Sequence, residues 1–102
     1  VIQLFSTDTT KNFEARIYWN KNSQVAYIDV LDLPIPDEGK QYQLWAEVSG
    51  KMVAAGLLQW KGDTLPIKIG NIPNASAFAI SLEATGGSNT PTQHAVIVAG
   101  KV

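Results

Sequence analysis

The chain of 102 residues contains no cysteine, one methionine and one histidine. The absence of cysteine excludes disulfides, thiolate metal sites and a cysteine nucleophile, and it permits an oxidising compartment without demonstrating one. Long apolar runs are also absent, because the longest stretches, residues 52–58 and 95–99, are far shorter than the roughly 18 to 20 residues of a membrane helix. None of these residues is expected to span a bilayer.

Basic charge is scarce. Eight Lys and Arg residues are spread among nine acidic residues, for a net charge of -1, so no surface for nucleic acid is expected. The share of apolar residues, 45%, is that of a folded chain, and the length fits one domain over residues 1–102. The chain starts in strand-like sequence without Met or a leader, so we expect a longer natural protein with a segment upstream of Val1.

Alternation of apolar and polar residues, which is typical of β-strands, runs through the chain, and no window shows an amphipathic helical stripe. Strands are expected at residues 13–20, 24–31, 41–48, 52–60, 65–69, 77–84 and 95–102, in addition to the strand-like start. Turn signals rich in Gly, Asn, Ser and Pro separate them. We therefore predict an all-β fold, a two-sheet antiparallel β-sandwich of the immunoglobulin-like kind with seven to eight short strands.

Residues suited to catalysis are few. His94 is the single histidine, and its hydroxyl neighbours lie in a predicted loop without a Gly-x-Ser-x-Gly elbow. A metal site would depend on His94 and isolated carboxylates without ligand spacing, and the Gly86-Gly87 pair lacks the lysine and helix of a phosphate loop. We predict no catalytic, cofactor-binding or metal site, with a hydrolase at His94 as an alternative.

The aromatic residues allow two interpretations. Six large rings are available for a sugar-binding platform, namely Trp19, Trp45, Trp60, Tyr18, Tyr27 and Tyr42. Core packing is favoured, because small β domains fill their interior with such rings. Trp45 is the exception, since alternation places it opposite Tyr42 and Leu44, on a face that is either exposed or covered. A secreted or surface carbohydrate-binding module that uses Trp45 is therefore the alternative function.

Two segments together resemble one family. Leu33-Pro34, the segment GKQYQLW at 39–45 and Gly56 are similar to the pattern LP…GK-x-YQLW…G of anti-sigma-K factors (RskA-like). The segment AISLEATGGSNTPT at 79–92 is similar to the family's aVTLEPaGGSpxPT ending, although Ala84 replaces a family proline. The motif positions that we expect to be structural are Tyr42, Leu44, Trp45, Gly56, Leu82, Glu83, Gly86, Gly87, Ser88, Pro91 and Thr92.

Glu83 has a role that its position alone suggests. It stands where a predicted strand meets the glycine loop, so its carboxylate is placed to accept backbone N–H bonds from a turn. A catalytic role would need a second carboxylate across a cleft, and the sequence offers no such pair.

The resemblance implies the C-terminal, extracytoplasmic domain of a single-pass membrane anti-sigma factor, without catalysis. In such a protein a cytoplasmic N-terminal segment inhibits an extracytoplasmic-function sigma factor, and regulated proteolysis releases it. The expected location is the outer face of the cytoplasmic membrane, periplasmic or extracellular. The sigma factor and the membrane would be reached only through the missing upstream segment and helix, which leaves an envelope protein or a protease as partner of this domain.

Overall fold

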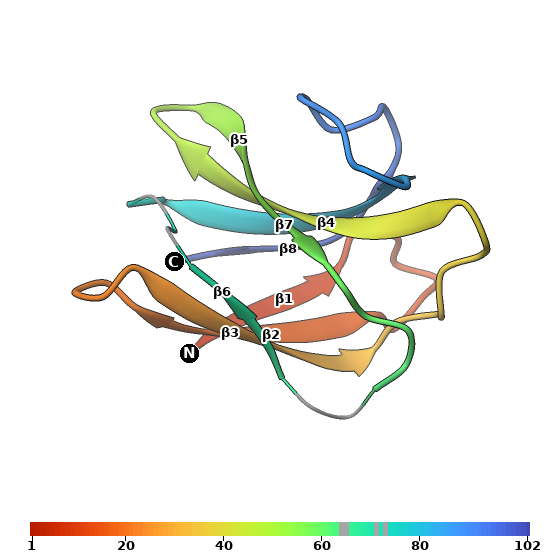
Figure 1. The fold of residues 1–102 in the computed structure, drawn as a ribbon, viewed down its shortest axis with the longest axis horizontal. Helices are drawn as coiled ribbons and strands as arrows, with labels where there is room; N and C mark the ends of the chain where they lie inside the picture. Colours follow the sequence, from red (N-terminus) through yellow and green to blue (C-terminus); the bar gives the residue numbers. More distant parts are fainter. Residues whose placement is uncertain (64–65, 71, 73) are drawn as a thin grey trace.

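The computed structural model describes residues 1–63, 66–70, 72 and 74–102, and within this part the chain forms strands and no helix (Figure 1). The strands are β1 (Ile2–Ser6), β2 (Glu14–Asn20), β3 (Val25–Asp32), β4 (Lys40–Val48), β5 (Lys51–Leu58), β6 (Ile67–Ile69), β7 (Ala77–Ala84) and β8 (Val96–Lys101). The prediction of an all-β chain is confirmed. Leu65, the expected start of the sixth strand, lies outside the described residues.

All these strands belong to one antiparallel sheet, in the order β5-β4-β7-β8-β1-β2-β3-β6. β8 joins the two halves, because it pairs with β7 on one side and with β1 on the other, where Phe5 lies opposite Ala99. The end strands β5 and β6 contact each other, so the sheet curls into a nearly closed, barrel-like shape (Figure 1). The sheet is not clearly divided into the two layers of the predicted sandwich. Alternation shows which side chains point inward, but it does not show which strands share a hydrogen-bonded ladder.

A bulge in β5 brings the two ends of the sheet together. The register between β4 and β5 shifts between Leu44 and Trp45, next to the position where Leu44 lies opposite Gly56. A bulge bends its strand, and β5 curves in Figure 1 from its hairpin with β4 toward β6. Gly56 permits this approach, because a Cβ there would lie 3.0 Å from Cγ2 of Ile69. The motif glycine thus sits where the sheet closes.

The interior is filled by the inward side chains of both halves of the sheet. Its fully buried members include Leu4, Ile17, Ile28, Leu44, Phe78, Ile80 and Val98. Tyr42 lies among them, and its hydroxyl donates a hydrogen bond of 2.6 Å to the carbonyl oxygen of Pro34. This bond ties the connection between β3 and β4 to the wall of the sheet. It also satisfies the one polar atom of a ring that is otherwise packed in apolar surroundings.

Candidate functional site

The two sequence motifs lie on neighbouring strands. β4 and β7 pair antiparallel, from Lys40 opposite Ala84 to Glu47 opposite Ala77. Both faces of this pair are buried, because four side chains on the outer face are at most 4% exposed: Gln43, Trp45, Ser81 and Glu83. The loop at residues 85–95, blue in Figure 1, is bonded to this outer face and covers it. The motifs therefore form one unit of strand, strand and loop.

The carboxylate of Glu83 is the centre of this unit. It is 1% exposed and accepts four hydrogen bonds. Oε2 accepts from Ser81 Oγ at 2.5 Å and from the Thr92 backbone N–H at 3.1 Å, whereas Oε1 accepts from Ser88 Oγ at 2.9 Å and from Thr92 Oγ1. Trp45 Nε1 donates to Ser81 Oγ at 2.7 Å, which extends the network to β4. We call these five residues the Glu83 network.

Neutral hydrogen-bond donors determine the pKa of the Glu83 carboxyl. Burial alone raises the pKa of the Glu83 carboxyl, but the hydrogen bonds from Ser81, Thr92 and Ser88 outweigh burial and lower the pKa below the ordinary glutamate value. Glu83 is therefore ionised at neutral pH, and every group that donates to it is a neutral hydroxyl or amide. This environment suits a structural anion, because a general acid needs a raised pKa and access to a substrate.

Two glutamine side chains of β4 hold the glycine loop in place. Gln43 Oε1 accepts the Ser88 N–H at 2.9 Å and Gln43 Nε2 donates to the Ser88 carbonyl at 3.0 Å, while Gln41 Oε1 accepts the Gly86 N–H at 3.2 Å. Gly87 lies between these bonds with a φ of 82°. A Cβ on Gly87 would lie 2.9 Å from Gln43 Oε1, so only glycine fits where the loop presses onto the sheet.

The other predicted positions have simpler surroundings. Leu82 is half-buried and packs against the interior, and Pro91 is half-buried in the loop beside Thr92. His94 is exposed, with a φ of 65°, just before β8. The hydroxyls of Ser88 and Thr92 donate to Glu83, so they are already used by the network. Within the described residues no group of three His, Asp or Glu side chains could hold a metal ion.

The aromatic residues that sequence analysis considered for a sugar-binding platform are partly buried and partly exposed. Trp45 is 0% exposed, so the hypothesis that it stacks on a sugar is wrong and the covered alternative holds. Its Nε1 donates to Ser81 Oγ inside this covered face. Trp60 and Tyr42 are also buried. The exposed rings are Phe5, Tyr18 and Tyr27. The face of Tyr18 was not predicted from the sequence, although its alternation with Arg16 and Asn20 is the signal that predicts an outward position.

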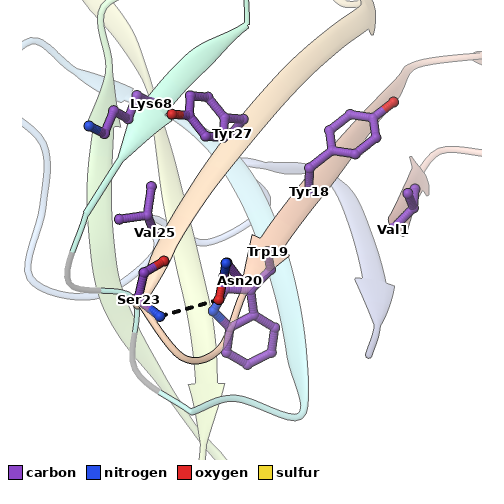
Figure 2. A pocket seen from close by; sticks show the side chains of 8 residues that line it. All are labelled: Val1, Tyr18, Trp19, Asn20, Ser23, Val25, Tyr27 and Lys68. Atoms are coloured by element: carbon purple, nitrogen blue, oxygen red, sulfur yellow. Dashed lines mark hydrogen bonds between the residues drawn. The ribbon is translucent and has the colours of Figure 1, made fainter.

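Tyr18 and Tyr27 border an open hollow on the outer side of β2, β3 and β6 (Figure 2). Its lining consists of Val1, Tyr18, Trp19, Asn20, Ser23, Val25, Tyr27 and Lys68. The molecule therefore carries two sites of different character. One is the sealed Glu83 network, and the other is this open aromatic hollow.

The fold and the Glu83 network define an all-β domain in which both motifs serve to bind a long loop to its own sheet. The model of the family described as "Anti-sigma-K factor rskA, C-terminal" matches residues 1–96, and the chain belongs to this family. It is thus a regulatory domain of the anti-sigma factor class.

A curated protein is similar to part of this chain. A Streptomyces griseus protein described as "Uncharacterized protein in phr 5'region" is 39% identical over 62 residues, which are 60% of this chain and 26% of that protein. The matched stretch is thus about a quarter of the length of that relative. No solved structure matches the chain.

The described part of the chain contains no helix that is long and apolar enough to cross a membrane.

Proposed function

We propose that this chain is the extracytoplasmic regulatory domain, without catalytic activity, of a single-pass membrane anti-sigma factor that controls an extracytoplasmic-function sigma factor and is released by regulated proteolysis. The observation that carries the proposal is the family match over residues 1–96, because the family is the C-terminal region of anti-sigma-K factors. In this arrangement the sigma factor binds a cytoplasmic segment upstream of Val1, and a membrane helix separates that segment from the present domain.

The chemistry of the chain is consistent with this location. The domain contains no cysteine, and the bonds that fix its longest loop are those of the Glu83 network and the Gln43 clamp. Stability of this kind does not depend on the redox state of the compartment. The fold therefore needs no disulfide, which is compatible with a location outside the cytoplasm.

The structure also supports a role in limiting proteolysis. Segments that are paired in a sheet are poor substrates until they open locally, and the population of the open form follows its free energy. The loop at residues 85–95 is held closed by bonds to β4 and β7. We therefore expect that variants which break the Glu83 network make the domain easier to cleave and raise sigma-dependent transcription.

A fusion experiment tests the topology. Alkaline phosphatase, which is active only outside the cytoplasm, and green fluorescent protein, which fluoresces only inside it, are each joined after Val102 in the full-length natural protein. We expect phosphatase activity and no fluorescence. Fluorescence without phosphatase activity would place the domain in the cytoplasm and contradict the proposal.

A transcription experiment tests the regulatory role. The full-length protein is expressed with its sigma factor and a reporter that this sigma factor drives, in the wild-type form and with Glu83→Ala. We expect higher reporter activity and a shorter cleaved product for Glu83→Ala. Equal activity of the two forms, despite a measured loss of stability in Glu83→Ala, would mean that this domain does not control release.

A further inference from the structure

The open hollow of Figure 2 is built on a row of side chains that crosses three strands. Tyr18 of β2 lies opposite Tyr27 of β3, and Tyr27 lies opposite Lys68 of β6. Directly paired side chains on one face of a sheet have Cβ atoms about 5 Å apart, and from these neighbouring positions the ring of Tyr27 points toward Lys68 and that of Tyr18 away from it (Figure 2). Tyr18 is 39% exposed and Tyr27 is 45% exposed. Each of the two aromatic rings therefore presents part of its surface to solvent on this face, with the side chain of Lys68 beside Tyr27.

The end of the hollow near the β2–β3 turn is polar and rigid. Asn20 Oδ1 accepts the N–H of Asn22 at 3.0 Å and of Ser23 at 3.2 Å. These bonds fix the amide group of Asn20, so its Nδ2 donor has a set orientation, and the hydroxyl of Ser23 lies beside it (Figure 2). Trp19 is held by edge-to-face packing on Phe78, with ring centroids 5.3 Å apart. A preformed site of this kind loses little conformational entropy on binding.

The residues that line the hollow carry positive charge and no negative charge. None of its eight lining residues is acidic, and Lys68 is basic. Lys21 is also close, since its Nζ lies 5.2 Å from the ring centroid of Trp19. A ligand that carries negative charge is therefore favoured over a neutral or cationic one.

We propose that this hollow binds a saccharide chain that carries carboxylate groups. The C–H face of a pyranose ring is apolar and matches an aromatic ring in size, so Tyr18 and Tyr27 can each stack against one sugar unit. Asn20 and Ser23 bond the sugar hydroxyls, and Lys68 pairs with a carboxylate. The inference does not rest on the proposed function, because the hollow is the same on either side of a membrane.

The surface around the hollow favours a saccharide over a protein partner. One row further along the strands, Arg16 lies opposite Asp29, so two charged residues separate the tyrosines from the exposed ring of Phe5. A stable protein interface needs about 800 Å² on each partner and an apolar centre. A narrow row of two rings with polar groups at its ends fits a sugar chain better.

Calorimetric titration of the 102-residue chain tests the proposal. The probes are oligogalacturonides of four to six units and uncharged malto-oligosaccharides of the same lengths. We expect the acidic probe to bind with a Kd on the order of 1 mM or tighter and the uncharged probe to bind several-fold more weakly. Tyr27→Ala weakens binding of both probes about 10-fold or more, and Lys68→Gln removes the preference for the acidic probe.

Phe5→Ala is the matched control, because Phe5 is an exposed ring on the same outer face but does not line the hollow. It should leave binding unchanged, and all three variants should melt as the wild type does, since the altered side chains are exposed.

Three results would overturn the proposal. The first is no heat of binding with about 10 mM acidic probe, and the second is an equal loss of binding in Phe5→Ala and Tyr27→Ala. The third is a dimer in size-exclusion chromatography that Tyr27→Ala dissociates while no saccharide binds, which would make this face a protein interface.

Discussion

Replacing Glu83 tests whether its buried carboxylate stabilises the folded protein. Glu83→Ala removes the acceptor of four hydrogen bonds and leaves Ser81 Oγ and the Thr92 N–H in a covered site without it. A buried polar group that loses its partner costs about 1 to 3 kcal/mol. The hydroxyls can rotate toward other acceptors and the amide cannot, so one unpaired amide and the lost charge-assisted bonds each cost about 1 to 3 kcal/mol, and we expect a total loss of about 2 to 5 kcal/mol in the free energy of unfolding.

Glu83→Gln should cost less, for a reason that the geometry supplies. The amide oxygen can take the place of Oε2, where it still accepts from Ser81 Oγ and the Thr92 N–H. The NH₂ group then faces two hydroxyls, those of Ser88 and Thr92, which can rotate to accept from it. The loss is then the charge assistance of these bonds, and we expect about 1 to 3 kcal/mol.

The pH dependence distinguishes the charge from the shape of this side chain. The pKa of Glu83 is lower in the folded protein than its ordinary value. Its contribution to stability is therefore complete above the unfolded pKa of about 4.3 and is lost as the pH falls through the lower folded pKa. Glu83→Gln has no such group, so its deficit relative to the wild type should shrink as the medium is acidified.

Urea unfolding followed by tryptophan fluorescence measures these quantities for the three proteins at about pH 7 and about pH 3. We expect the order wild type, Glu83→Gln, Glu83→Ala at neutral pH, and a smaller gap between the first two at acid pH. The role given to the carboxylate would be refuted if Glu83→Gln were less stable than the wild type by under about 0.5 kcal/mol at neutral pH. A difference of that size is an ordinary surface effect.

Three further predictions concern the same motifs. Tyr42→Phe loses the hydrogen bond to Pro34, so the free energy of unfolding should fall by about 1 kcal/mol. Burial also raises the pKa of Tyr42 to about 12, so the wild type should lose more stability than this variant as the pH rises from about 10 to 12. Unfolding curves at each pH measure this difference. Gly87→Ala should lower the melting temperature more than Gly86→Ala, because both glycines have positive φ but only at Gly87 would the added Cβ meet side chains at 2.7 to 2.9 Å; equal shifts would remove the role given to this contact. Leu44→Ala should cost about 2 to 5 kcal/mol in urea unfolding, because Leu44 is 0% exposed in the core.

Much of the strand pattern follows from alternation. The expected strand at residues 77–84 has the bounds of β7, and the inward positions of Phe78 and Ile80 are buried as predicted. The closure of the sheet was not predictable in the same way. It depends on β8 pairing with two partners and on the bulge opposite Gly56, and hydropathy carries no information about either.

The candidate sites illustrate why polar patterns mislead. Trp45 alternates with Gln43 and Glu47, which suggests a solvent-facing side, yet it is completely buried. The polar residues around it are satisfied by one another and by the loop, so a polar sequence here marks a hydrogen-bonded interior. The pairing of Tyr18 with Tyr27 depends on the β2–β3 register, which the turn between the two strands sets.

The most direct test is a carbon-detected NMR titration of the Glu83 side-chain carboxyl in the wild-type chain. If the two motifs meet at a buried carboxylate held by neutral donors, the midpoint lies below the ordinary glutamate pKa of about 4.3 and moves together with the amide signal of Thr92. The network would be contradicted by a Glu83 titration midpoint at or above the ordinary glutamate pKa. It would also be contradicted by a Thr92 amide signal that does not shift as Glu83 titrates.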